Sequence, residues 1–190
     1  MKLEKLRGIE QTVYQPAEDS ALLAEAARDG VDDTDFVLEV GTGSGYVADA
    51  LAETGAHVIG SDLNPHACRQ ARARGLEVVR ADLLAPFQPE TFDVVAFNPP
   101  YLPTDPDEEG DDWMEQALSG GESGRRVIAP FLADVGRVLV PDGVVFLLVS
   151  TLTGIDVVLE QAAQAGFHGQ QVLEESYPFE TLVVLELRRQ

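Results

Sequence analysis

The chain carries the segment Phe36-Val37-Leu38-Glu39-Val40-Gly41-Thr42-Gly43-Ser44-Gly45-Tyr46. Its apolar beginning, 36–40, has the length of a buried strand, and Gly41 ends that strand. Residues 46–54 then predict a helix. A strand that enters a helix through a glycine turn is typical of parallel α/β sheets, in which ligands bind at the carboxyl ends of the strands.

Short apolar strands and helical stretches alternate along the rest of the chain. The pattern predicts further strands at 57–61, 76–80, 92–97, 144–150, 170–174 and 181–187, and helices at 64–74, 123–139 and 155–165. A long polar loop follows 92–97, and Pro141-Asp142-Gly143 predicts a turn. Such alternation predicts an α/β fold with a mainly parallel sheet and helices on both faces.

Length and composition predict one domain, 1–190, because 45% hydrophobic residues are enough for a sizeable core. We divide it into an N-terminal segment with a helix, 1–30, a cofactor-binding half, 36–100, a substrate loop, 101–124, and a C-terminal half, 125–190. The sequence has no signal-peptide pattern and no apolar run of about 18 residues. We therefore expect a cytoplasmic protein that does not associate with membranes.

The chain is strongly acidic: 33 Asp and Glu residues against 13 Lys and Arg residues give a formal net charge of −20. That balance disfavours stable nucleic-acid binding, which depends on basic side chains. A strongly basic partner or a salt-rich cytoplasm would each explain the acidity, and the spread of acidic residues along the chain favours salt. Cys68 is the only cysteine and the histidines lack metal-ligand spacing, so we expect no metal site.

Carboxylates stand at the ends of three predicted strands. Glu39 precedes the glycines, where it would repel a phosphate, and Tyr46 occupies the place of the third glycine in a dinucleotide fingerprint. A cationic ligand such as S-adenosylmethionine fits better. Asp62 is placed to accept hydrogen bonds from ribose hydroxyls, and Asp82, beside Leu83, from an adenine amino group. Each Asp alone could equally be a surface residue, but together with the turn they predict a nucleoside-containing ligand.

The loop Asn98-Pro99-Pro100-Tyr101 directly follows the strand at 92–97. Two prolines make a rigid strand exit, which explains the prolines but neither Asn98 nor Tyr101. A planar amide substrate gives a chemical reason for both. The Asn98 side-chain oxygen and the Pro99 carbonyl could each accept one N–H of the substrate amide, and Tyr101 could pack on its flat face.

Three segments together resemble a known family: Val13-Tyr14-Gln15-Pro16-Ala17-Glu18-Asp19-Ser20, residues 37–45 and Asn98–Tyr101, with a weaker fourth at Gly120-Gly121-Glu122-Ser123-Gly124-Arg125. The chain resembles class I S-adenosylmethionine-dependent methyltransferases, and more narrowly the HemK-related glutamine methyltransferases that act on the GGQ motif of class I release factors. The resemblance implies a Rossmann-like, seven-stranded, mostly parallel sheet with an antiparallel last strand. It also implies S-adenosyl-L-methionine as cofactor and S-adenosyl-L-homocysteine as product.

The resemblance assigns roles to individual residues. Asn98, Pro99 and Tyr101 would be catalytic, and together with Pro100 they would bind the substrate. The cofactor would be surrounded by Ser20, Glu39, Gly41, Gly43, Asp62, Asp82, Leu83 and Asn98. The short form resembles the archaeal and eukaryotic branch, whose members need a small zinc-binding activator subunit. This implies a heterodimer in which the activator pairs along the edge strand Leu76–Arg80.

Several alternatives remain open from the sequence. An adenine amino group in DNA or RNA, or a protein lysine, could be the acceptor, and a non-catalytic subunit is a different class of function. The acidic run 104–115 is either a solvated loop or a receiver for a basic protein substrate. Trp113 is either a lid anchor or a substrate contact, and we expect Arg125 and Arg126 on a helix surface.

Overall fold

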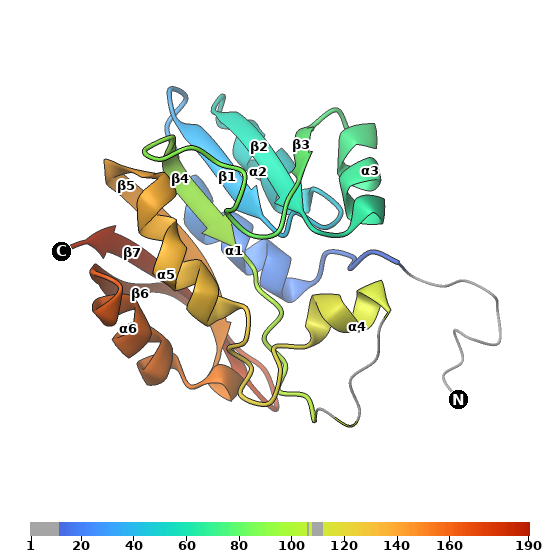
Figure 1. Ribbon diagram of the computed structural model, residues 1–190, viewed down its shortest axis with the longest axis vertical. Helices are drawn as coiled ribbons and strands as arrows, with labels where there is room; N and C mark the ends of the chain where they lie inside the picture. The colour runs from blue at the N-terminus through green and yellow to red at the C-terminus, as the bar shows by residue number, and fades with distance from the viewer. Residues whose placement is uncertain (1–11, 106, 108–111) are drawn as a thin grey trace.

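The computed structural model describes residues 12–105, 107 and 112–190. Within these residues seven strands form one sheet in the order β3-β2-β1-β4-β5-β7-β6 (Figure 1). The strands are β1 (Phe36–Val40), β2 (His57–Asp62), β3 (Glu77–Arg80), β4 (Phe92–Phe97), β5 (Leu139–Ser150), β6 (Phe167–Ser176) and β7 (Thr181–Arg189). Strand β7 runs antiparallel to both of its neighbours, and the other pairings are parallel. The predicted α/β fold, with its antiparallel last strand, is confirmed.

The helices cover both faces of the sheet (Figure 1). In the described residues they are α1 (Glu18–Arg28), α2 (Tyr46–Ala52), α3 (Pro65–Ala73), α4 (Trp113–Leu118), α5 (Ile128–Val138) and α6 (Ile155–Gln164), with a 3₁₀ turn η1 (Thr151–Thr153). None of these helices is both long and apolar enough to cross a membrane.

The apolar core has two halves because side chains alternate between the faces of a strand. In β1, Leu38 packs with the buried faces of α5 and α6, whereas Val37 packs with α1 and α2. Both residues are fully buried. Such burial on both sides explains why β1 has no polar alternation except at Glu39, which faces α2.

Several predicted elements are wrong in extent, among them the strand predicted at 170–174, which is β6 over Phe167–Ser176. The helix expected over 123–139 begins only at Ile128, because residues 119–126 hydrogen-bond to the segment after β4 instead. Pro141-Asp142-Gly143 is not a separate turn: β5 continues through it, and a register shift between Phe92 and Val94 of β4 absorbs the extra residues. The polar loop after β4 contains the short helix α4, which Asp112 caps by accepting from the Glu115 backbone N–H at 2.9 Å.

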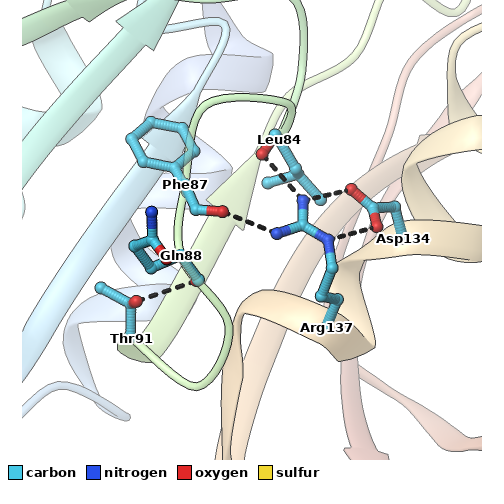
Figure 2. A network of polar contacts seen from close by, with 6 residues as sticks. All are labelled: Leu84, Phe87, Gln88, Thr91, Asp134 and Arg137. Atoms are coloured by element: carbon cyan, nitrogen blue, oxygen red, sulfur yellow. Dashed lines mark hydrogen bonds and ion pairs between the residues drawn. The ribbon is translucent and has the colours of Figure 1, made fainter.

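Arg137 of α5 forms hydrogen bonds to the loop between β3 and β4 (Figure 2). Its guanidinium donates to the carbonyls of Phe87 at 2.6 Å and Leu84 at 3.0 Å, and it pairs with Asp134 at 2.7 Å. Leu84 directly follows the predicted adenine-binding residues. The contact therefore fixes the distance between α5 and one wall of the candidate site.

Candidate active site

The glycine turn after β1 needs residues without a side chain. Gly41, Gly43 and Gly45 all have positive φ, between 53° and 84°. A β carbon on Gly45 would lie 2.6 Å from Leu76 Cδ1 and 3.1 Å from Ala71 Cβ, so the turn also needs the space. The turn and α2 can pack this closely against α3 only with glycine at position 45.

Glu39 lies beneath this turn rather than on a cavity wall. It is 3% exposed, and its Oε2 accepts hydrogen bonds from Thr42 Oγ1 at 2.5 Å and from the Ala48 backbone N–H at 2.9 Å. Burial is the main cause that raises the pKa of Glu39 to about 8. Its contacts tie β1, the turn and α2 into one unit.

Asp62, at the end of β2, holds the turn from the other side. Its Oδ2 accepts from the Gly43 backbone N–H and its Oδ1 from the Asn64 backbone N–H, both at 2.8 Å. Burial raises the pKa of Asp62. Asn64 in turn caps α3 by accepting from the His66 N–H at 2.9 Å. The carboxylate is thus held rigidly where it borders a large cavity.

That cavity has a volume of about 640 Å³ and lies at the carboxyl ends of β1, β2 and β3. Five residues predicted to bind the cofactor line it: Gly41, Gly43, Asp62, Asp82 and Leu83. Helix α4 contributes Trp113, Gln116 and Ala117, and Arg126 reaches the cavity rather than a helix surface as predicted. The space is of the size and mixed polarity that bind a small cofactor.

A smaller cavity of about 40 Å³ lies beside the first. It is lined by all four residues of the loop Asn98–Tyr101, and Tyr14, Pro100 and Ala117 line both cavities. Burial, followed by the charges of Asp19 and other acidic groups, raises the pKa of Tyr101 far above its ordinary range, so its hydroxyl stays protonated. The two cavities are adjacent compartments of one site.

A polar network that includes the Asn98 side-chain amide joins the N-terminal helix to this smaller cavity. Asp19 is 4% exposed, and its Oδ2 accepts from Asn98 Nδ2 at 3.1 Å and from the Tyr14 hydroxyl at 3.0 Å. The Ser20 backbone N–H donates to Asp19 Oδ1 at 2.6 Å. Sequence reasoning placed Ser20 in the site and missed Asp19 and Tyr14, although all three lie in the segment 13–20.

The segment 119–126 packs against the chain that follows the loop Asn98–Tyr101 and supports it. The Gly120 backbone N–H donates to the Leu102 carbonyl at 2.9 Å, and the Leu102 N–H donates to the Leu118 carbonyl at 3.0 Å. A β carbon on Gly124, which has a φ of 72°, would lie 2.5 Å from the Tyr101 carbonyl oxygen. The glycines of this weaker motif therefore allow close backbone packing that sets the position of Tyr101.

Comparison with known proteins identifies the family. A family model described as a methyltransferase domain matches residues 37–117. A provisionally named protein N5-glutamine methyltransferase of Methanocaldococcus jannaschii is 37% identical over 93% of this chain and 92% of its own length. The human methyltransferase HEMK2 is 35% identical over 96% of this chain and 92% of its own length. The chain belongs to the HemK-related N5-glutamine methyltransferases. It is therefore a class I S-adenosylmethionine-dependent methyltransferase.

A solved methyltransferase structure agrees with this assignment. The Mtq2 chain of the E. cuniculi Mtq2–Trm112 complex, which is responsible for methylation of the eRF1 translation termination factor, is 31% identical. The match has a TM-score of 0.80 and covers 95% of this chain and all of that chain. The family resemblance and the fold expected from it are both confirmed.

The cavities of this methyltransferase suit its cofactor class. The larger space has two carboxylates, Asp62 and Asp82, a glycine turn and the apolar Leu83, which match the hydroxyls, the cationic groups and the ring of a nucleoside cofactor. Within the described residues, Ser20 and Glu39 line neither cavity. Asn98, Pro99 and Tyr101 line the smaller cavity. Their roles toward cofactor and substrate remain predictions.

The acidic run 104–115 is described only in part, and the described residues contain no cluster of metal ligands. Residues 106 and 108–111 of the run 104–115 lie outside the described residues, whereas Trp113 lies in α4 and borders the larger cavity. Across 12–105, 107 and 112–190, no group of three or more His, Cys, Asp or Glu residues is placed to hold a metal ion.

Proposed function

We propose that this chain transfers a methyl group from S-adenosylmethionine to the side-chain amide nitrogen of the glutamine in the GGQ motif of a class I release factor. The wall that the two cavities share carries the proposal. Tyr14, Pro100 and Ala117 border both spaces, so a cofactor in the larger one and an amide in the smaller one would be neighbours.

The larger cavity would hold the cofactor. Gly41 and Gly43 let a ligand approach the backbone, Asp62 would accept from ribose hydroxyls, and Asp82 with Leu83 would hold the adenine. Arg126 brings a positive charge to the wall, which suits the carboxylate of the methionine portion. When bound, S-adenosylmethionine supplies an electrophilic methyl group. Ser20 and Glu39 would act indirectly, through Asp19 and through the glycine turn.

The smaller cavity would hold the substrate amide. Asn98 Oδ1 and the Pro99 carbonyl would accept the two N–H groups and orient the nitrogen, which is a weak nucleophile because its lone pair is delocalised. Tyr101, whose hydroxyl is kept protonated, would pack on the amide plane. We infer that the proton released after transfer passes to water.

The relatives support glutamine as the acceptor over adenine or lysine. The E. cuniculi complex acts on the eRF1 termination factor, and the names of the archaeal relative and of this family refer to N5-glutamine methylation. A formal charge of −20 also disfavours a nucleic-acid substrate.

We also propose an activator subunit as partner. The similar E. cuniculi chain is paired with Trm112 in its solved complex. In this chain β3 is an edge strand, and its Val78 and Val79 are only half-buried. An edge with apolar side chains favours pairing with another chain. The small zinc-binding activator would therefore lie along residues 76–80.

Radiolabelled S-adenosylmethionine tests the proposed activity. The enzyme, alone and with the activator, is incubated with a GGQ-bearing release factor, with the Gln-to-Ala variant of that factor, and with DNA. We expect label on the unmodified factor and none on the other two. Label on DNA or on the Gln-to-Ala factor would overturn the assignment of the acceptor.

A further inference from the structure

We propose that Asp19 is a positioning residue whose carboxylate turns the Asn98 side-chain amide so that its oxygen, Oδ1, is left to accept the substrate amide. This inference rests on the proposed function. It means that a residue of α1, outside the loop Asn98–Tyr101, sets the orientation of the Asn98 amide.

The chemistry of the two side chains fixes the direction of their contact. A carboxylate without a proton only accepts hydrogen bonds, whereas a primary amide has one accepting oxygen and one donating nitrogen. The group that faces Asp19 Oδ2 must therefore be Asn98 Nδ2, as found at 3.1 Å. Because Oδ1 and Nδ2 branch from the same carbon, a fixed Nδ2 also fixes the direction of Oδ1.

Asp19 is itself held from several sides. It lies in the first turn of α1, and donors reach it from the Tyr14 hydroxyl at 3.0 Å, from the Ser20 N–H at 2.6 Å and from the Ser20 hydroxyl at 3.3 Å. It is 4% exposed, so water competes little with these contacts. A carboxylate that accepts only from fixed donors can hold Asn98 in one orientation.

The contact lies in the wall of the smaller cavity. Asp19 and Asn98 both border the smaller space, and Tyr14, the other donor to Asp19 Oδ2, borders both spaces. An amide turned the wrong way would present two N–H groups to a substrate that also offers N–H groups. The orientation that Asp19 selects is the one in which Asn98 can accept.

A purely structural contact between α1 and the loop after β4 would also explain this hydrogen bond, and a swap of the two side chains separates the explanations. The variants are Asp19→Asn, Asn98→Asp and the double exchange. In the double exchange the Asn at position 19 donates to a carboxylate at position 98, which keeps one oxygen for the substrate. In Asn98→Asp alone, two carboxylates face each other and must share a proton.

We expect kcat for methylation of the release factor to fall about 10- to 100-fold in Asp19→Asn, the range for loss of a hydrogen bond to a charged group. In Asn98→Asp we expect a fall that deepens as the pH rises. The double exchange should be faster than either single variant and should lose that pH dependence. The dissociation constant for S-adenosylmethionine, measured by calorimetry, should stay within about 3-fold throughout.

Asp93→Asn is the matched control. Asp93 also joins distant segments, because its Oδ2 accepts from the Phe36 backbone N–H at 2.8 Å, but it borders neither cavity. Its loss should lower stability and leave kcat within about 3-fold. Wild-type kcat in Asp19→Asn, or a double exchange no faster than the slower single variant while equally folded, would overturn the positioning role.

A second readout does not need activity. In ¹⁵N-labelled protein one of the two Asn98 side-chain NH₂ protons should be shifted downfield and exchange slowly with solvent, and Asp19→Asn should move that signal toward the position and exchange rate of a solvent-exposed amide. Unchanged Asn98 signals in Asp19→Asn would overturn the inference. If the wild type labels no release factor yet the Asn98 signals respond as expected, the proposed substrate fails and the contact between Asp19 and Asn98 stands.

Discussion

The Asp62 carboxylate closes the glycine turn: its Oδ2 accepts a hydrogen bond from the Gly43 backbone N–H at 2.8 Å. Its Oδ1 accepts from Asn64 N–H at the same distance, so one side chain joins the turn after β1 to the start of α3. The same carboxylate borders the larger cavity. A single residue thus shapes the site and presents a charge to it.

Asp62→Asn should weaken S-adenosylmethionine binding about 10- to 100-fold, because an uncharged amide holds the turn and the ribose less strongly than a carboxylate. Isothermal calorimetry measures the change. The control is Asp49→Asn. Asp49 lies on α2 and forms an exposed ion pair with Arg74, so its loss should leave the affinity for S-adenosylmethionine unchanged. Equal affinity of Asp62→Asn and wild type would show that Asp62 does not contact the cofactor.

Glu39 should make stability depend on pH. Its pKa rises from 4.5 to about 8 on folding, so between these values the folded protein keeps a proton that the unfolded chain has lost. Rising pH then favours the unfolded chain by up to about 1.4 kcal/mol per pH unit, and the loss ends above the folded pKa. Glu39→Gln cannot titrate, so its free energy of unfolding should fall less steeply from pH 5 to pH 8.

Urea unfolding of both proteins at fixed KCl measures this difference, because the other carboxylates titrate alike in the two chains. We expect the two curves of stability against pH to converge or cross as the pH rises and to run parallel above about pH 8. Parallel curves over the whole range would show that Glu39 titrates alike in the folded and unfolded chains.

Asn98→Ala should abolish methyl transfer while cofactor affinity falls only slightly, because Asn98 borders the smaller cavity and not the larger one. The expected loss in kcat is at least about 100-fold, as when a preorganised group at the reacting atoms is removed. Single-turnover transfer to the release factor and calorimetry with S-adenosylmethionine measure the two effects. Normal turnover would contradict the role given to the amide.

The local parts of this architecture were predictable from sequence. Strand β1 ends where Gly41 interrupts an apolar run, and α3 begins where Asn64 and Pro65 provide a cap and a first turn, so their bounds follow from short-range signals. The predicted extent of β4 is likewise confirmed. The exits of these parallel strands meet at one edge of the sheet, which brought most of the expected cofactor residues to one cavity.

The parts that were not predictable depend on distant contacts. The helix predicted from residue 123 starts late, at Ile128, because residues 119–126 pair with the chain after Tyr101. The contact between Asp19 and Asn98 joins residues 79 positions apart, and no local pattern indicates it. Arg126 looks like a surface residue until the fold brings α4 and α5 to the same cavity.

The two edges of the sheet offer a matched test of the activator. Val79→Lys on β3 should prevent co-purification with the zinc-binding activator, because it places a charge on the proposed apolar contact. Val172→Lys is the control on the opposite edge strand β6, where Val172 is 39% exposed. Size-exclusion chromatography of co-expressed pairs should show a heterodimer for Val172→Lys and a free enzyme for Val79→Lys. A heterodimer for Val79→Lys and a free enzyme for Val172→Lys would show that the activator binds along β6 instead of β3.

The charge of −20 should make the protein depend on salt. Ion pairs such as Arg28–Glu53 and Arg74–Asp49 are exposed and contribute little, so they do not offset the repulsion among the remaining carboxylates. Because the Debye length falls from about 10 Å at 0.1 M to about 3 Å at 1 M, added KCl should screen that repulsion. We expect Tm to rise steeply as KCl increases from dilute buffer to molar concentrations.

Sucrose separates screening from the general effect of an excluded solute, because it strengthens burial without carrying charge. At matched osmolality, KCl should raise Tm more than sucrose does, and most of the rise should come below about 1 M, where the Debye length changes most. A Tm that falls with KCl, or one that responds equally to KCl and sucrose, would mean that the acidic surface does not govern stability and would favour a basic partner as the reason for it.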